Sequence, residues 1–429
     1  MLGLSGVVRD GISALDCLRG QTKKGKYRMS ADYFTPAIVL AISATLSFGP
    51  SLPAQADPLA PEGVSGSSQA APHIVPGNQG PGVESAASAA VLDYVTRPAP
   101  PPSFDYMAAT DEELRTFGLP PRPDPVRDPK AHAFWKKMMA ASKHRVTPIL
   151  QRTNIFHGPP KNLAQVASQQ IPPTAGDGPT GLRNISKPTT PPNLVNTTVS
   201  SSTNWSGYAN YEPLAPYNSS KSFVLAEWTV PFAQQAFGVC TGGWEYSSEW
   251  PGFDGLGSND VLQAGSESDA YCLNGATQQF YSLWYEWYPA ASVRITNLSI
   301  APGNLIEAYI WYSTTAPLGN AYLVNLTNNT STYIGFNPPA GTTFQGTSAE
   351  WIVEAPTVNS SQSLLTNYTV VPWNYALAYS TSRSQYAIPT YTATGTAYNI
   401  NMVSGGATIS SCGYSSPYAL WCIPAGSAL

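Results

Sequence analysis

Short runs of alternating apolar and polar residues occupy the chain from residue 198 onward. In the clearest run, 347–354, alternation directs Glu350, Ile352 and Glu354 to one face of a strand and Trp351 and Val353 to the other. Turn residues separate these runs, and no long stretch has helical periodicity. The pattern predicts an all-β domain, a sandwich or a barrel built from many antiparallel strands. We expect strands at 205–211, 222–230, 243–253, 261–266, 279–288, 292–300, 305–313, 321–328, 349–355 and 365–371.

The N-terminus has the pattern of a secretory signal. Basic residues at 23–28 precede an apolar run at 37–48, and Ala-Gln-Ala at 54–56 supplies the small residues that a signal peptidase accepts. The apolar run is too short for a comfortable membrane span. We therefore expect a signal peptide over 1–56, with Met29 as an alternative start and an uncleaved anchor as the alternative interpretation. The remainder of the chain would be secreted and free of the membrane.

Residues 57–197 have the composition of an accessory region. The stretch 57–102 is rich in Pro, Ala, Gly and Ser and has no apolar period, which predicts disorder. The same composition returns at 159–192 and predicts a linker where processing could occur. We interpret 57–197 as a propeptide and 198–429 as the folded domain.

Two short helices are expected inside this accessory region. Thr110 and Glu113 form a capping-box pattern, and Gly118 is a suitable stop. Asp128, followed by proline, opens a second helix at 129–142. That helix carries apolar residues at i, i+4 spacing beside several lysines. It is either a solvated charged face or the basic part of an inhibitory propeptide.

The charge distribution favours the second interpretation. From residue 198 onward the chain has three basic residues and twelve acidic ones, whereas the whole chain has a net charge of only −4. An acidic domain argues against a nucleic-acid partner, because phosphate binding requires a basic face. It suits work at low pH, where carboxylates are neutralised. A basic propeptide would then be held by charge near neutral pH and released by acid.

Histidine is absent from the predicted domain. The chain has four, and all precede residue 198: His73, His132, His144 and His157. Within 198–429 this excludes a Ser-His-Asp triad, a Cys-His dyad and a histidine-ligated zinc site. Catalysis there must use carboxylates, amides or hydroxyls.

The cysteines fit an exported protein. With Cys17 lost in the signal, the four that remain are compatible with two disulfides. The simplest pairing joins Cys240 to Cys272 and Cys412 to Cys422, although the two other connectivities stay open.

Five stretches combine the character of a buried strand with awkwardly placed polar groups. They are NWSGY from Asn204, WPGFDG from Trp250, VLQAG from Val261, WYEWYP from Trp284 and AEWIVE from Ala349. In this order and wording the set resembles the glutamic peptidases of the eqolisin type, family G1. The resemblance implies a secreted acid protease made with a propeptide and needing no metal or cofactor. It also implies a concanavalin A-like sandwich of two seven-stranded antiparallel sheets, with Gln263 and Glu350 as the catalytic pair.

Elementary chemistry is compatible with that pair. A glutamate on a desolvated sheet face can have its pKa raised and serve first as base and then as acid, as Glu350 would. A Gln263 amide would offer an N–H donor to the developing oxyanion. For the other motif residues, substrate-groove or supporting roles compete with plain structural roles: satisfied buried carboxylates for Asp254 and Glu286, and core packing for Trp205, Trp250 and Tyr288.

The main prediction is thus an endopeptidase that acts on a protein or peptide substrate, is inhibited by its own propeptide and works as a monomer. Two other functions remain open. One is a glycoside hydrolase that uses Glu286 and Glu350 as a carboxylate pair, although the compact E-x-D-x-x-E arrangement is missing. The other is a secreted carbohydrate-binding module without activity.

Overall fold

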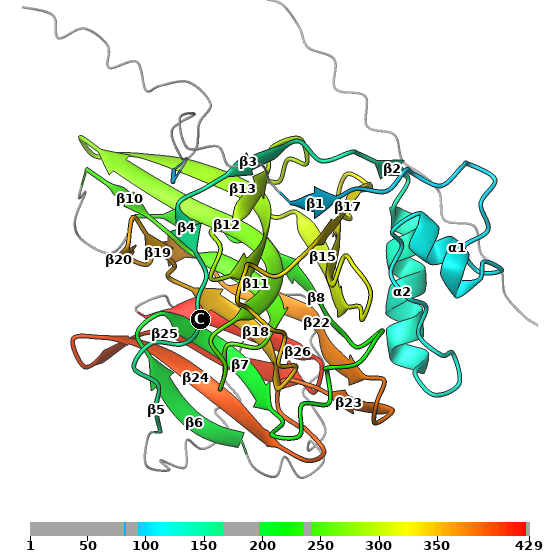
Figure 1. Ribbon diagram of the computed structural model, residues 1–429. Coiled ribbons are helices and arrows are strands. Elements are labelled where there is room, and N and C mark those ends of the chain that lie inside the picture. Colours follow the sequence, from blue (N-terminus) through cyan, green and yellow to red (C-terminus); the bar gives the residue numbers. More distant parts are fainter. Residues whose placement is uncertain (1–80, 83–92, 166–196, 236–241, 426–429) are drawn as a thin grey trace, which may run out of the picture. The chain divides into compact units, whose positions relative to one another are not determined.

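The computed structural model describes residues 81–82, 93–165, 197–235 and 242–425 (Figure 1). The predicted signal peptide at 1–56 lies outside these residues, as does most of the predicted linker, 166–196. Within the described ranges, none of the helices has both the length and the apolar character that a membrane crossing requires.

Two antiparallel layers, each of seven strands, make up the folded part. The first sheet contains, in spatial order, β14 (Val293–Ile295), β13 (Ala276–Tyr288), β12 (Val261–Leu273), β11 (Ser248–Phe253), β18 (Ser348–Glu354), β7 (Trp205–Tyr211) and β24 (Thr396–Ser404). The second contains β25 (Ala407–Ser416), β26 (Ala419–Pro424), β22 (Val371–Ser380), β8 (Phe223–Thr229), β15 (Leu305–Tyr312), β16 (Gly319–Asn325) and β17 (Thr330–Phe336). The β24–β25 hairpin joins the two sheets at one corner.

Short strands add to the edges of this sandwich or form two small sheets of their own. They are β1 (Tyr94–Val95), β2 (His144–Arg145), β3 (Leu150–Arg152), β4 (Ile155–Phe156), β5 (Ala164–Gln165), β6 (Thr197–Ser202), β9 (Ala233–Gln234), β10 (Trp244–Glu245), β19 (Thr357–Val358), β20 (Ser361–Gln362), β21 (Asn367–Tyr368) and β23 (Gln385–Ala387).

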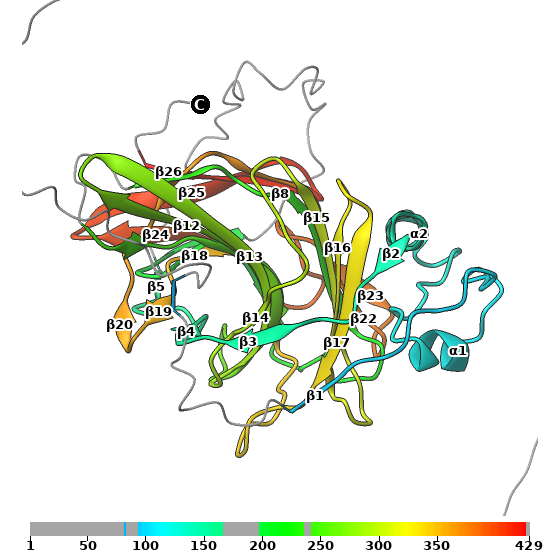
Figure 2. The ribbon, with the colours of Figure 1, turned by 90° about the horizontal axis from the view of Figure 1, so that it is seen from above.

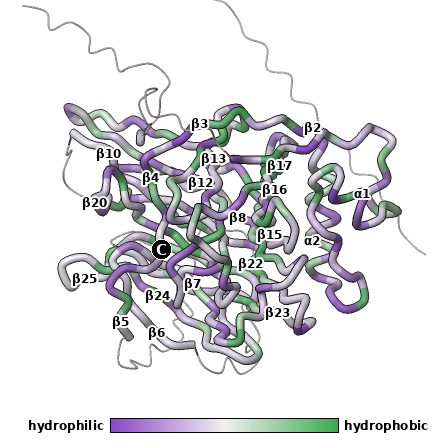
Figure 3. Tube along the Cα trace, viewed as in Figure 1, coloured by the Kyte–Doolittle hydropathy of each residue, from purple (hydrophilic) through white to green (hydrophobic). Residues whose placement is uncertain are grey.

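The alternating pattern places one set of side chains between the sheets and the other set outside. Trp351 and Val353 of β18 lie in the interior cluster with Val224 and Ala226 of β8, whereas Ile352 belongs to a separate cluster on the outer face of the first sheet. Figure 3 accordingly shows hydrophobic and hydrophilic positions within single strands. The predicted fold class is confirmed.

The predicted strand list is right in the middle of the domain and wrong toward its end. Strand 292–300 is reduced to β14, and 365–371 is split between β21 and the start of β22. Strands β17, β24, β25 and β26 were not predicted. Strands β17 and β25 are rich in Ser, Thr and Gly, and β26 is a run of only six residues, so their sequences do not predict strands without the partners that pair with them.

Both predicted helices form. Helix α1 (Asp111–Thr116) has the complete capping box between Thr110 and Glu113. Helix α2 (Pro129–Ala141) begins at the expected proline, but the Asp128 side chain makes no capping hydrogen bond.

Helix α2 packs on the outer face of the second sheet (Figure 2). Trp135 is fully buried there and donates from Nε1 to the Pro120 carbonyl oxygen at 3.0 Å. Lys137 forms ion pairs with Glu227 and, at 3.1 Å, with Glu307. Burial raises the pKa of Glu307 to about 9, although Lys137 opposes the shift. The interpretation of α2 as a solvated face is therefore wrong, because it docks on the acidic domain through apolar and charged contacts.

Parts of the predicted disordered and linker segments are ordered. Strand β1 pairs with β17, the Gly82 carbonyl accepts from the Asn154 amide at 2.8 Å, and β5 pairs with β6. The disorder predicted for 57–102 is thus wrong at 81–82 and 93–102, and 159–165 is not a free linker.

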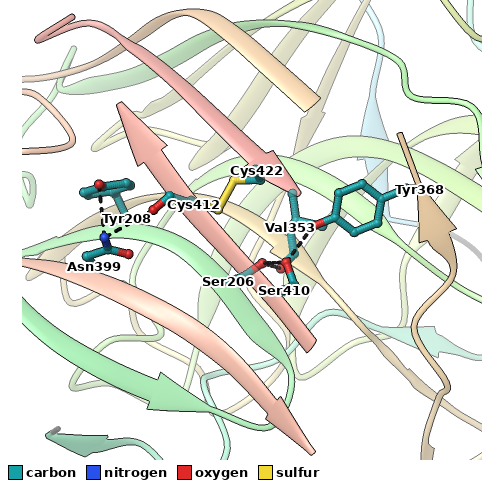
Figure 4. The surroundings of a disulfide bond; sticks show 8 residues. All are labelled: Ser206, Tyr208, Val353, Tyr368, Asn399, Ser410, Cys412 and Cys422. Carbon is teal, nitrogen blue, oxygen red and sulfur yellow. Dashed lines mark hydrogen bonds between the residues drawn. A yellow bond between two sulfur atoms is a disulfide. The ribbon is translucent and has the colours of Figure 1, made fainter. Parts of the chain in front are cut away.

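One predicted disulfide is present. Cys412 and Cys422 face each other across β25 and β26 (Figure 4). Beside it, the Ser410 hydroxyl hydrogen-bonds to Ser206 at 2.6 Å and to Tyr368 at 2.5 Å, which ties β25 to β7 of the first sheet and to the short strand β21. Cys272 is also disulfide-bonded, while its predicted partner, residue 240, lies outside the described residues.

Truncation of Trp135 to alanine should detach α2 from the second sheet. Losing a fully buried tryptophan costs about 3–5 kcal/mol, which exceeds what the half-exposed Lys137 contacts supply. Amide hydrogen exchange should show lost protection in 129–141 with the sandwich strands unchanged. The matched control is Val126→Ala, at a side chain that is 86% exposed. Unchanged exchange in the Trp135 variant would contradict the packing role.

Candidate active site

A row of side chains crosses the first sheet at one level. Cross-strand pairing places Glu286 opposite Gln263, Gln263 opposite Gly252, Gly252 opposite Glu350, and Glu350 opposite Ala209. Directly paired residues point to the same face of a sheet, so all five face outward, away from the interior cluster.

Gly252, in the middle of this row, is buried and has no space for a side chain. A Cβ atom at this position would lie only 3.0 Å from the Cβ of Gln263 and 3.0 Å from the Trp250 ring. Glycine therefore leaves a strip of bare backbone between Gln263 and Glu350. Their own backbones are two strands apart, roughly 10 Å.

Glu350 is fully buried, and neither of its carboxylate oxygens accepts a well-formed hydrogen bond within the described part of the chain. Burial raises its pKa well above the ordinary value. The nearby Asp254 carboxylate raises it further, while the Ser348 hydroxyl and the Leu256 amide favour the charged form. A buried carboxyl with free acceptor capacity is expensive to maintain, and such groups are typical of functional sites.

Gln263 donates from Nε2 to the backbone carbonyl oxygen of His157. Its own Oε1 has no hydrogen-bond partner among the residues described. The amide thus already binds a peptide carbonyl, and it retains an acceptor that could orient a water molecule.

His157 is the centre of a tight cluster on this face. The ring is fully buried and stacks on Trp284 at 3.8 Å with an interplanar angle of 6°. Nδ1 lies 2.6 Å from Glu286 Oε2, and Nε2 lies 2.5 Å from Glu267 Oε1. The His157 backbone amide also donates to both oxygens of Glu286 at 3.1 Å.

The carboxyls that hold His157 have raised pKa values. Burial raises the pKa of Glu286 to about 7, against the opposing effect of His157. Burial raises the pKa of Glu267 to about 8, with Asp269 and Arg294 opposing the shift. Both groups therefore change charge over the weakly acidic to neutral range.

The chain continues from His157 across the sheet. Trp205 Nε1 donates to the Gly158 carbonyl at 2.9 Å, and Asn204 Nδ2 donates to the Pro159 carbonyl at 3.2 Å. Asn204 Oδ1 then accepts from the Lys161 amide at 2.7 Å. The NWSGY motif therefore binds the backbone of an upstream segment.

The sequence reasoning missed His157 and Glu267. Histidine is absent from 198–429, and the histidine in this cluster comes from the upstream region, 57–197, that was predicted to be a propeptide. The only sequence signal was indirect: acids at Glu267 and Asp269 directly after the VLQAG motif, without a basic residue nearby to balance them.

The remaining motif residues divide into two groups. Tyr288 contacts the upstream segment, since a Cβ on Gly158 would lie 2.9 Å from its ring, and Trp205 binds it through the indole. Trp250 is buried, donates to Glu354 Oε2 at 3.1 Å and meets Trp205 edge-on at 5.1 Å. For Trp250 the geometry favours packing.

Asp254 holds the loop that leads into β18. It accepts from the backbone amides of Gln345 at 3.0 Å, Gly346 at 2.8 Å and Thr347 at 2.8 Å. Burial raises its pKa to about 7, helped by Asp260. Asp254 therefore fixes the start of the strand that carries Glu350 and has no direct contact with the upstream segment.

The structure describes no group of three His, Cys, Asp or Glu side chains arranged to hold a metal ion in the ranges given above.

The raised carboxyl pKa values predict that the fold is most stable in acid. A carboxyl whose pKa is higher in the folded state binds its proton more tightly when folded. Its stabilising effect is complete below the unfolded value of about 4 and is lost as the pH rises through the folded value. For Glu286 and Glu267 the loss falls between about pH 4 and pH 8.

Urea unfolding should therefore show a free energy of unfolding that drops by several kcal/mol from pH 4 to pH 8, because a change of one unit in pKa corresponds to about 1.4 kcal/mol. Adding Glu286→Gln should make the drop shallower. A free energy that increases over this range would contradict the expectation.

Comparison with known proteins identifies the family. Residues 203–422 match the family model described as the Peptidase A4 family. Aspergillopepsin-2 of Aspergillus niger is 31% identical over 146 residues, 30% of this chain and 50% of that protein, so the chain spans about half the length of the curated relative that it matches.

Two solved structures share 23–24% identity with the chain. Scytalido-glutamic peptidase, solved with a peptide-based transition state analogue, aligns with a TM-score of 0.41 over 52% of this chain and 98% of its own. Aspergilloglutamic peptidase from Aspergillus niger aligns with a TM-score of 0.36 over 42% and 99%. Since the family model covers more than half of the sequence, as the five motifs led us to expect, this chain belongs to the peptidase A4 family.

Proposed function

We propose that this chain is a secreted acid endopeptidase, made as a zymogen, in which Gln263 and Glu350 form the catalytic dyad. The observation that supports it most directly is the hydrogen bond from Gln263 Nε2 to a peptide carbonyl, on the same face and at the same level of the sheet as the buried Glu350 carboxyl. A donor on the carbonyl and a carboxyl next to it are what amide hydrolysis requires.

Each side chain has a defined task. Glu350 takes a proton from a water molecule that attacks the carbonyl carbon, and later gives that proton to the leaving nitrogen. The Gln263 amide stabilises the negative charge that develops on the carbonyl oxygen. Asp254 keeps β18 in place through the 345–347 loop. Glu350 loses part of its desolvation when water enters the cleft, which brings its pKa down toward the acid range.

The zymogen part of the proposal rests on where the upstream residues lie. Helix α2 docks on the outer face of the second sheet, and residues 157–161 run over the outer face of the first, against Gln263 and Asn204. A substrate cannot reach Gln263 while His157 holds its amide. Secretion is supported by the signal pattern at 1–56 and by cysteines that pair as disulfides.

The glycosidase alternative has less support. Glu286 is hydrogen-bonded to His157, and its backbone lies three strands from that of Glu350, roughly 14 Å. Glycosidase carboxyls are about 5–10 Å apart, so this pair is poorly placed for that chemistry.

Substitutions in the dyad should separate activity from folding. After acid activation, the chain should hydrolyse a denatured protein at about pH 3. Gln263→Ala should reduce kcat about 100- to 1,000-fold, because one oxyanion donor is lost. Glu350→Gln should reduce it at least as far, because the base is lost.

The matched control is Glu307→Gln, a glutamate of similar burial on the opposite sheet, which should retain activity. Circular dichroism and urea midpoints would establish that each variant folds. Full activity in a folded Gln263→Ala protein would refute the dyad.

Substitution of His157 should relieve latency. In the intact precursor at about pH 7, His157→Ala removes the ring contacts to Glu267 and Glu286 and weakens the segment that blocks Gln263. Initial hydrolysis of a short fluorogenic peptide should increase about tenfold or more over the unprocessed wild type, with intact mass checked in parallel. His144→Ala, at an exposed histidine of the same region, is the control and should stay latent. Equal latency in both variants would contradict a blocking role for His157.

A further inference from the structure

The segment over the candidate dyad is bound as a substrate would be. We propose that the peptide bond between His157 and Gly158 is the first bond that the protein cuts in its own chain when the precursor is acidified. The inference rests on the proposed function and adds to it the position of self-processing.

Two carbonyl contacts define where this bond lies. The His157 carbonyl is held by Gln263 on β12, and the next carbonyl, that of Gly158, is held by Trp205 on β7. Strands β11 and β18 lie between those two anchors and contribute Gly252 and Glu350 at the level of Gln263. The bond that leaves the His157 carbonyl therefore runs from the β12 side toward the β7 side, over the face of the sheet that carries Gln263, Gly252 and Glu350.

Pairing at both ends keeps the segment stretched over the sheet. Upstream, β4 pairs with β19 through Ile155 and Phe156; downstream, β5 pairs with β6. Gly158 passes so close to Tyr288 that a Cβ would meet its ring at 2.9 Å. An extended backbone held by pairing and by single donors on successive carbonyls is the usual binding mode of a peptide on a sheet.

The side chain before the bond fills a pocket of its own. His157 lies between Glu267 and Glu286 on the face of Trp284. A ring with a carboxyl at each nitrogen is fixed in position and orientation, and this fixes its carbonyl on Gln263. The pocket has the chemistry to accept a cationic or imidazole side chain on the acyl side of the bond.

The charges around the ring explain why acid would start the reaction. Glu267 on β12 and Glu286 on β13 face the His157 ring directly. The charged groups that act on these two carboxyls are Asp269 on β12, Arg294 on β14 and Glu354 on β18, and Lys161 acts on Glu354. Each ring nitrogen of His157 is within hydrogen-bond distance of one of these carboxyls, Glu286 at Nδ1 and Glu267 at Nε2. Protonation of the two carboxyls as the pH falls removes their charge and weakens their hold on the ring, which loosens the segment.

The cut is a hydrolysis that consumes one water molecule and needs no other reactant. Water adds to the carbonyl carbon of His157 while Glu350 takes one of its protons. The carbon–nitrogen bond to Gly158 then breaks, and the nitrogen takes the proton from Glu350. One fragment ends in the carboxyl group of His157, and the other begins with the amino group of Gly158.

The test is to acidify the purified full-length precursor to about pH 3, quench samples over time, and map the products by intact mass and N-terminal sequencing. The earliest pair of products should split between His157 and Gly158, and the rate constant should not depend on protein concentration. A first cut elsewhere, with this bond intact in the active product, would overturn the proposal.

Further variants test whether the cut is made within one chain and whether it depends on His157. Mixed with wild type, a mass-tagged Glu350→Gln precursor should stay uncut at this bond during the first turnover, since the cut is made within one chain. His157→Gln should slow the first cut about tenfold or more, whereas His144→Gln should not. An equal rate in both would contradict the pocket.

Digestion of a denatured protein, measured in parallel, distinguishes failure of this inference from failure of the proposed function. Digestion with an uncut His157–Gly158 bond refutes only this inference. No digestion, and no cut, refutes the proposed function itself.

Discussion

The register of β12, β11 and β18 is the constraint on which the rest of the site depends. It sets Gln263, Gly252 and Glu350 at one level and on one face. A shift of one residue in either pairing would turn one of the two polar side chains into the apolar interior, where Trp351 and Val353 pack. The same alternation that buries the core therefore fixes the position of the candidate dyad, and Asp254 secures the start of β18 through three amides of the preceding loop.

The upstream region is part of the folded structure on both sides of the sandwich. On the second sheet it supplies α2, whose aromatic and methionine side chains cover the face around Tyr309. On the first sheet it supplies an extended segment whose backbone is bound by Gln263, Trp205 and Asn204. These two contacts differ in kind. The helix is held largely by apolar burial, which does not depend on pH. His157 is held by carboxyl groups, and these contacts change when the carboxyls gain or lose a proton.

The domain contains several buried carboxyl groups. Glu286, Glu267 and Asp254 all have pKa values raised mainly by burial. Such groups lower the free energy of unfolding near neutral pH and raise it in acid. The same property that stabilises the sandwich at low pH also weakens the hold on His157, so stability of the domain and release of the segment respond to acid in opposite directions.

From the sequence alone, alternation identified the fold class and the strands in the middle of the domain, and five motifs identified the family and the candidate dyad. Helix α1 and its capping box were likewise local enough to predict, because the signal lies within a few residues. Only the tertiary structure decided that His157 joins the face of Gln263 and that 159–165 binds the sheet. Those contacts join residues more than 40 positions apart, and a Pro-rich sequence carries no pattern that says which distant backbone donors it will meet.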